Sequence, residues 1–228
     1  DLHIHSCASP CGDEEMTPNN IVNMAYIKGL DVISVTDHNT IANTEVISEL
    51  AKRRGILFIP GIEIQTKEEV HILCYFPQTD MIKLFEAELA PFRTQIKNNS
   101  KVFGNQWIMD EEDAVVGEVE CALIMSINIS IEALEKLVKK YKGVIVPAHV
   151  NKLSNSILVN LGFIPNDLDI HTVEIHEKSS LNEKLVEAYH KIFNSDAHYL
   201  KDIHEPLHTF DLYEKSCEAV IDYLAGKV

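Results

Sequence analysis

Several features are missing from this 228-residue sequence. No run approaches the roughly 18 apolar residues that a membrane-spanning helix requires, and no basic-then-apolar segment opens the chain, so we expect neither a membrane partner nor a secretory signal. Glycine and proline are scarce, with nine and eight residues, which argues against a fibrous or disordered protein. Because the chain begins at Asp1 rather than at methionine, we expect further residues to precede it.

Disulfide-forming and basic residues are few as well. Five cysteines, at positions 7, 11, 74, 121 and 217, are an odd number, and without a secretory signal they predict a reducing, cytoplasmic location. Lys and Arg number 20 against 35 Asp and Glu, which gives a formal net charge of −15. Such a chain lacks the basic surface that binds long duplex nucleic acid or anionic membranes. It would also repel a phosphate substrate unless cations lie in the site.

With 46% hydrophobic residues, the sequence can form a substantial core, and we expect residues 1–228 to be one domain of unknown oligomeric state. Short apolar, β-branched runs alternate with helical patterns, which predicts an α/β fold with a parallel sheet. The expected strands are 31–36, 57–60, 70–75, 144–147, 172–175 and 192–194. The expected helices are 18–28, 41–54, 80–98, 131–141, 181–189 and 213–225. This number of strands favours a barrel, although their order alone does not close one.

Residues 102–125 interrupt this alternation. We expect two strands around an exposed turn, forming a hairpin insertion near the active site. Trp107 is interpreted as a hydrophobic anchor, and the acidic run 110–113 as a solvated turn.

Histidines and carboxylates follow the expected strands. His3 and His5 are two residues apart, so on a strand both side chains point to one face. Asp196 and His198 repeat this spacing, and His38, Glu63 and His149 each follow an apolar run. In parallel α/β folds the carboxyl ends of the strands meet where active sites form. We therefore interpret these side chains as one constellation.

Imidazole and carboxylate donors together suit Zn, Mn or Fe, and the set exceeds what one ion needs. We expect two or three divalent ions. Two ions about 3.5–4 Å apart are a usual device for phosphoryl hydrolysis, in which one activates water and both stabilise the developing charge. Such ions would also make an acidic protein locally attractive to phosphate.

The motifs occur in a specific order along almost the whole chain. They are Asp1-Leu2-His3-Ile4-His5-Ser6, Thr36-Asp37-His38-Asn39-Thr40, Gly61-Ile62-Glu63-Ile64, His71-Ile72-Leu73, Pro147-Ala148-His149 and Ser195-Asp196-Ala197-His198. In this order the sequence resembles the PHP (polymerase and histidinol phosphatase) family of metal-dependent phosphoesterases. The resemblance implies a distorted seven-stranded β/α (TIM-like) barrel with a trinuclear site at the carboxyl ends of its strands.

The resemblance also implies roles for single residues. His3, His5 and Asp196 would bind one ion, His71 and His149 a second, and His38 and His198 a third, with Glu63 as the bridge. Of these, Glu63, His38 and Asp196 are the expected catalytic residues. Taken singly, each motif has a plainer explanation, and His71 in particular could belong to a core strand.

One segment departs from the family pattern. Relatives carry a further His or Asp shortly after the first motif, whereas this chain reads Ser6-Cys7-Ala8-Ser9-Pro10-Cys11-Gly12-Asp13. The ligand could be Asp13, Cys11 or Cys7, or the site could lack it. A thiolate would suit Zn, and a carboxylate Mn or Mg. The two cysteines could equally be small buried residues of a loop.

The expected function is hydrolysis of a small phosphorylated metabolite or nucleotide by metal-activated water. Two alternatives remain, an exonuclease on short single-stranded oligonucleotides and a non-catalytic metal-binding module. Lys152 could bind substrate phosphate as a point charge, or be a solvated lysine. His176 shares a strand face with Glu174 and could reach the substrate, or lie at the surface or in the core.

Overall fold

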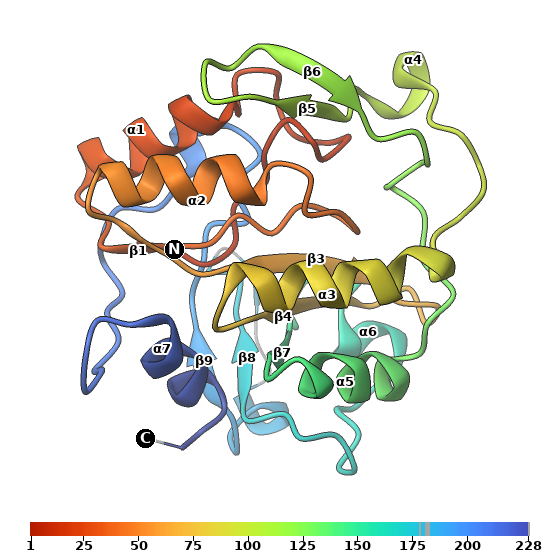
Figure 1. The fold of residues 1–228 in the computed structure, drawn as a ribbon. Coiled ribbons are helices and arrows are strands. Elements are labelled where there is room, and N and C mark those ends of the chain that lie inside the picture. Colours follow the sequence, from red (N-terminus) through yellow and green to blue (C-terminus); the bar gives the residue numbers. More distant parts are fainter. Residues whose placement is uncertain (178, 181–182, 228) are drawn as a thin grey trace.

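A computed structural model describes residues 1–177, 179–180 and 183–227 (Figure 1). Its helices are α1 Pro18–Lys28, α2 Thr44–Arg53, α3 Thr79–Leu89, α4 Ser100–Phe103, α5 Ile131–Lys140, α6 Ile157–Asn160 and α7 Cys217–Leu224, with 3-10 turns η1 Ala90–Phe92, η2 Glu183–Leu185 and η3 Leu200–Asp202. Its strands are β1 Val32–Ile33, β2 Leu57–Phe58, β3 Gly61–Gln65, β4 His71–Tyr75, β5 Trp107–Met109, β6 Val115–Glu118, β7 Val144–Pro147, β8 Thr172–Glu174 and β9 His190–Ile192.

The helix signals in the sequence have structural counterparts. The Thr17 side chain accepts from the backbone N–H of Asn20 at the start of α1, and Gly29, at φ 74°, ends the helix in the left-handed conformation. Ser130 caps α5 in the same way through the N–H of Ala133. The prediction of a helix over 18–28 is confirmed, and the helix predicted over 131–141 ends one residue earlier, at Lys140.

Four helix predictions need correction. The helices predicted over 41–54 and 213–225 begin later, at Thr44 and Cys217, and end one residue earlier. In the segment predicted as a helix over 181–189, residues 183–185 form η2 and residues 186–188 a turn, whereas 181 and 182 lie outside the described residues. The helix predicted over 80–98 ends at Leu89, and Pro91 lies in the 3-10 turn that follows. Proline fits the first turn of a helix but lacks the N–H that a helix interior needs.

The prediction of a parallel sheet is confirmed for only part of the structure. β1 pairs with β2 and β8 with β9 in parallel, but β3, β4 and β7 form an antiparallel sheet. Residues 66–70 join β3 to β4, and so short a link allows only a hairpin, because a parallel crossover takes a dozen residues or more. The described residues thus form a mixed α/β fold with four small sheets, and single bridges pair further segments, such as Ile4 with Val35 and Ala197.

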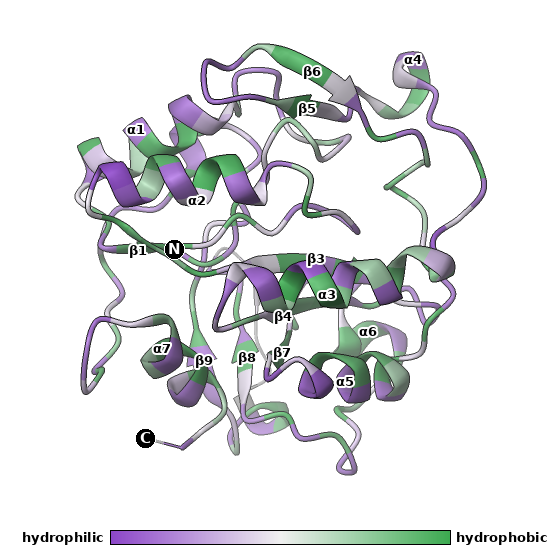
Figure 2. Ribbon diagram, in the orientation of Figure 1, coloured by the Kyte–Doolittle hydropathy of each residue, from purple (hydrophilic) through white to green (hydrophobic). Residues whose placement is uncertain are grey.

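Three apolar clusters surround these strands. One lies among β3, β4, β7 and the helices α3 and α5, a second lies beneath α1 and α2, and a third lies against α7. Figure 2 shows the helices with hydrophilic and hydrophobic residues on different faces. No helix in the described ranges is both long and apolar enough to cross a bilayer.

The hairpin β5–β6 packs on the loop that follows the first histidine motif (Figure 1). Its half-buried Trp107 donates its backbone N–H to the carbonyl of Cys7 at 2.9 Å. The sequence predicted that the acidic run 110–113 is a solvated turn, but part of it makes specific contacts. Asp113 accepts hydrogen bonds from the Thr17 hydroxyl at 2.6 Å and from the backbone of Asn19 at 3.0 Å, so it binds the start of α1.

Candidate metal centre

Adjacent backbone segments carry the first and last motifs. Ile4 forms parallel bridges with both Val35 and Ala197, and the backbone N–H of His5 donates to Ala197 at 2.9 Å. His38 in turn bridges Glu63. These pairings bring side chains that are up to about two hundred residues apart in the sequence to one end of the strands.

Glu63 lies at the centre of this group and is fully buried. Five imidazole nitrogens approach its carboxylate: His38 Nδ1 at 2.8 Å, His71 Nδ1 at 2.9 Å, His3 Nε2 and His149 Nε2 at 3.4 Å, and His5 Nε2 at 3.5 Å. Neither carboxylate oxygen accepts a hydrogen bond of proper geometry. A buried carboxylate without a hydrogen-bond partner is costly, and lone pairs that converge in this way need a shared cation.

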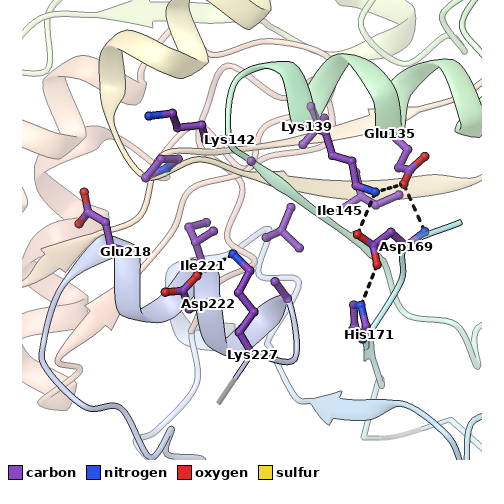
Figure 3. A pocket seen from close by; sticks show the side chains of 15 residues that line it. Glu135, Lys139, Lys142, Ile145, Asp169, His171, Glu218, Ile221, Asp222 and Lys227 are labelled. Atoms are coloured by element: carbon purple, nitrogen blue, oxygen red, sulfur yellow. Dashed lines mark hydrogen bonds and ion pairs between the residues drawn. The ribbon is translucent and has the colours of Figure 1, made fainter.

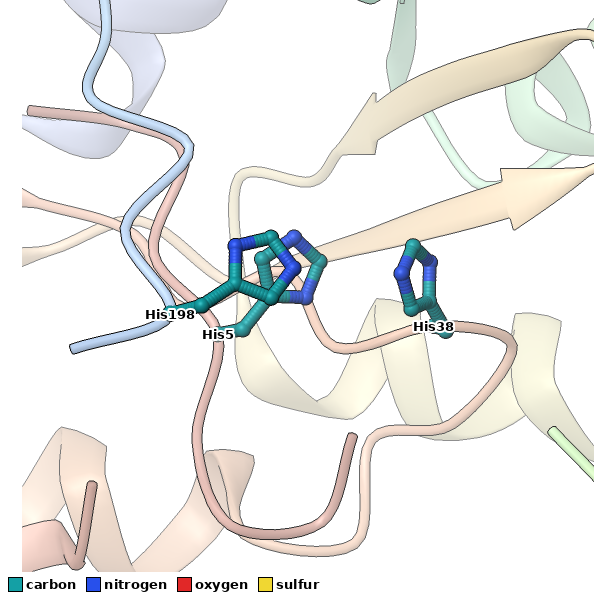
Figure 4. A group of neighbouring side chains, drawn as sticks. All are labelled: His5, His38 and His198. Atoms are coloured by element: carbon teal, nitrogen blue, oxygen red, sulfur yellow. The ribbon is translucent and has the colours of Figure 1, made fainter. Parts of the chain in front are cut away.

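The donor atoms form three overlapping groups, and within each group they lie within 4.8 Å of one another. The groups are His3, His5 and Asp196; His38, Glu63 and His71; and His5, His38 and His198. Figure 4 shows the three rings of the last group gathered around one space. Nitrogen and carboxylate oxygen donors in this number fit more than one divalent ion of the zinc, manganese or iron type.

The far side of three imidazoles is held by a hydrogen-bond partner. His3 Nδ1 lies 3.0 Å from both oxygens of Glu174, His5 Nδ1 lies 3.0 Å from Ser9 Oγ, and His198 Nδ1 lies 2.8 Å from the Asp196 carbonyl. Such partners fix the ring orientation and leave the Nε2 lone pair for an ion.

Glu174 is a functional residue that the sequence analysis did not single out. It is buried, and besides His3 it accepts the backbone N–H of His149 at 2.8 Å and the Asn194 side chain at 2.8 Å. It thus orients two expected ligands at once. Its only sequence signal was its place near the end of an apolar run.

Two expected ligands have a left-handed backbone, which non-glycine residues rarely adopt: His149 has φ 30° and Asp196 φ 52°. Such strain persists where the surroundings enforce it, typically at functional sites.

Asp37 has a different role from its neighbour His38. It accepts from the Ser6 backbone at 2.7 Å and from the Ser9 hydroxyl at 2.6 Å, and so holds the loop after the first motif.

The charges of the group depend on one another. Burial alone would lower the pKa of His3, but the surrounding carboxylates outweigh this effect and raise it well above its usual value. Burial alone would raise the pKa of Glu63, whereas the nearby imidazoles hold it well below its usual range. Without a bound cation, protons on imidazole are therefore the counter-charge that the described residues offer Glu63.

The structure distinguishes the three candidates after the first motif. The Asp13 carboxylate accepts from the Glu15 backbone at 2.9 Å in a turn, and the buried Cys7 sulfur contacts the Met109 sulfur at 3.5 Å. Cys11 is exposed. Burial alone would lower the pKa of His38 and His198, but the Cys11 thiol lies close enough to both imidazoles to help raise it. Desolvation alone would raise the pKa of Cys11, but these two imidazoles lower it to about 7.

A cavity of about 620 Å³ opens beside the group. Its lining includes Lys152, His176, Asp196, His198, Tyr199 and His204. Lys152 forms an ion pair with Asp196, and His176 Nδ1 lies 2.9 Å from Ser179 Oγ. The two expected substrate-binding side chains thus line a space next to the expected ligands.

Another cavity, of about 450 Å³, lies between α5 and α7 at the opposite end of β7 (Figure 3). Here Lys139 bridges Glu135 and Asp169, and His171 contacts Asp169. None of the expected metal ligands lines this cavity.

A mixed α/β fold with buried histidines and carboxylates gathered at the strand ends defines a protein suited to binding divalent metal ions. The sequence matches the PHP domain family over residues 1–221, and the chain belongs to this family.

Individual relatives match over shorter segments. A 5'-3' exoribonuclease of Haemophilus influenzae is 41% identical over 76 residues, which are 32% of this chain and 27% of that protein. A 3',5'-nucleoside bisphosphate phosphatase of Chromobacterium violaceum is 32% identical over 76 residues, or 32% of this chain and 26% of that protein. The matched segments thus span only about a quarter of these relatives.

Among solved structures, the lesion-specific endonuclease PfuEndoQ from Pyrococcus furiosus superimposes with a TM-score of 0.71 at 20% identity, over 99% of this chain and 55% of that one. Endonuclease Q in complex with a 27-mer duplex that carries an abasic lesion gives a TM-score of 0.70 at 20% identity, over 99% and 56% of the two chains. At this identity the likeness concerns the fold.

Proposed function

We propose that this chain is a metal-dependent phosphoric ester hydrolase. The observation that carries the proposal is Glu63, a fully buried carboxylate that has no hydrogen-bond partner and is approached by five imidazoles. Divalent ions held there would supply a water nucleophile of lowered pKa and neutralise charge on the phosphoryl oxygens. His3, His5 and Asp196 would hold one ion, His71 and His149 a second, and His38 and His198 a third, with Glu63 between them.

Other residues of the chain position these ligands. Glu174 holds His3 and the backbone of His149, and Ser9 holds His5, so the donor atoms are in place before an ion arrives. Such preorganisation avoids reorganisation during the reaction.

The proposed substrate is a small phosphorylated metabolite or a nucleotide. The cavity beside Asp196 and His198 has the volume of a small-ligand site. Lys152 would give up its contact with Asp196 to a substrate phosphate, and His176 would contact the substrate farther from the ions. Both roles follow from their position in the cavity lining.

A short-oligonucleotide exonuclease is the second candidate, and the 41% identical exoribonuclease segment favours it. The net charge of −15 argues against long duplex nucleic acid as a substrate, although the fold is shared with an endonuclease bound to duplex DNA. The test is turnover of the zinc-, manganese- or iron-loaded protein on a nucleoside bisphosphate, a short 5'-phosphorylated RNA and an abasic duplex. We expect the bisphosphate to be hydrolysed fastest.

Duplex cleavage at the highest rate would contradict the proposed substrate class. Absence of hydrolysis with every substrate and every ion, in protein that binds the ions, would favour the third reading, a non-catalytic metal-binding module. Preservation of nearly all the expected ligands argues against that reading.

We further propose that residues 1–228 are one PHP domain whose strands follow the path of a distorted seven-stranded barrel, and that 102–125 is an insertion that borders the site. Backbone contacts support the path: residues near Ile4 pair with segments near Val35 and Ala197, and Val150 donates to the Glu174 carbonyl at 2.9 Å between the β7 and β8 regions. The free cysteines are consistent with a cytoplasmic location.

A further inference from the structure

The loop between the first motif and α1 has a tightly defined course. The N–H of Ser9 donates to the carbonyl of Ser6 at 3.0 Å, that of Gly12 to Ser9 at 2.9 Å, and that of Asp13 to His198 at 2.9 Å. A Cβ atom on Gly12 would lie 2.3 Å from the Ser6 carbonyl oxygen, so only glycine fits this position. The loop therefore folds back on itself and returns to the last motif.

The hairpin insertion fixes the loop from the other side. Gly104 packs so closely on the loop that a Cβ atom there would lie 1.9 Å from the Pro10 carbonyl oxygen. The Asn105 side chain also donates to Glu14 at 2.8 Å. Cys11 follows Pro10 directly, so its position is set by contacts on both sides of the loop.

Only one of the three candidate side chains in this loop reaches the imidazoles. Cys7 is directed to Met109 and Asn43, and the Asp13 carboxylate closes a turn. The Cys11 thiol contacts His38 and His198. These two rings belong, with His5, to a group whose nitrogen atoms lie within 4.8 Å of one another.

We propose that Cys11 binds, as a thiolate, the ion held by His38 and His198, and that this sulfur makes the position selective for zinc-like ions over magnesium and manganese. This inference rests on the proposed metal centre. Soft thiolate ligands select Zn, whereas carboxylate and water suit Mg and Mn. The remaining ligands supply nitrogen and oxygen alone, so this ion differs in kind from its neighbours.

The test uses the metal-stripped full chain, titrated with Co²⁺ and followed by near-ultraviolet absorbance. Bound Co²⁺ gives a thiolate-to-metal charge-transfer band only when sulfur is a ligand. We expect the band in the wild-type chain and in the control Cys121→Ser, whose cysteine forms a backbone bridge with Lys97. Cys11→Ser should lose the band and bind one equivalent of cobalt more weakly by more than about 10-fold, since outer-shell partners alone account for that much.

Cys11→Asp keeps a metal-binding atom at this position, so it separates loss of the sulfur ligand from loss of binding through misfolding. It should bind the same number of ions as the wild type, show no charge-transfer band, and weaken zinc relative to manganese. A second measurement needs no variant: zinc should slow alkylation of Cys11 in the wild-type chain, and magnesium should not.

A wild-type chain that shows no band at saturating cobalt, or a Cys11→Ser chain that keeps it, would overturn the proposal. The outcome is independent of the proposed hydrolase activity. A charge-transfer band without hydrolysis would support the thiolate ligand and refute the activity. Hydrolysis without a band would support the activity and refute the thiolate ligand.

Discussion

The two ends of β7 carry two groups of charged side chains that differ in how their charges are compensated. At one end, between α5 and α7, Lys139 lies 2.7 Å from Glu135 and 2.8 Å from Asp169, and His171 lies 2.7 Å from Asp169 (Figure 3). Glu135 and Asp169 thus each have a partner that donates to them. At the other end, Glu63 is fully buried and neither of its oxygens accepts a hydrogen bond.

This difference separates a structural group from a binding site. An uncompensated buried charge costs several kcal/mol. Lys152 pairs with Asp196, and among the described residues only imidazoles approach Glu63, so we expect Glu63 to acquire a metal cation. At α5 and α7, Glu135 and Asp169 already share Lys139. Although both ends have a cavity, only the one beside Asp196 and His198 is lined by expected metal ligands.

The largest effect should come from replacing the central carboxylate. Glu63→Gln keeps the shape of the side chain but removes the charge that the proposed ions share. We expect loss of tightly bound metal and a drop in hydrolysis of well over about 100-fold, beyond what outer-shell changes produce. Metal analysis and a phosphatase assay measure the two effects. Hydrolysis at the wild-type rate would show that the mechanism is wrong.

A matched pair of glutamates tests the comparison itself. Glu174→Gln disturbs the partner of His3 and His149 and should weaken metal binding about 10–100-fold. Glu135→Gln, at the other end, should leave metal affinity unchanged and lower the free energy of unfolding by only about 1 kcal/mol. Calorimetric titration and denaturant unfolding separate the two. Equal effects on metal affinity would break the distinction between the ends.

Raising the pH should increase the stabilisation given by an ion. Burial opposes protonation of His3 and His38, but Glu174 beside the first and Glu63 beside the second help raise both pKa values above 6.5. The stability that these protons give the ion-free chain is present below pH 6.5 and lost as the pH rises through the folded-state pKa values.

Ions bind the deprotonated rings. The gain in Tm on adding zinc should therefore grow as the pH rises above 6.5 and shrink below it. A gain that is the same on both sides of pH 6.5 would show that these imidazoles are not ligands.

The smallest effect is expected from Lys139→Met. Lys139 is half-exposed, and an ion pair of this kind contributes less than about 1 kcal/mol. Thermal unfolding should move little, and metal content should not change. Loss of bound metal in this variant would connect the two ends of the strand in a way that the structure does not suggest.

The sequence best predicted those parts of the fold that neighbouring residues determine. Helix α1 was predicted to the residue because Thr17 and Pro18 specify its start. The antiparallel order of β3, β4 and β7 was missed because β3 was not recognised as a strand, so its short link to β4 was not noticed.

The candidate ligands could be predicted because they lie within or directly after apolar segments, where histidine and carboxylate side chains are unusual. Glu174 escaped because its role depends on His3, which is 171 positions away in the sequence. The choice among Cys7, Cys11 and Asp13 also needed the structure, since the three share one short loop and differ only in where the loop directs them.

The central claim is that Glu63 lies among several divalent ions. An anomalous-difference map from crystals grown with zinc tests it most directly. We predict at least two peaks within coordination distance of the Glu63 carboxylate, each also reached by histidine nitrogens. A map at saturating zinc without a peak there, with Glu63 hydrogen-bonded to protonated imidazoles instead, would contradict the account.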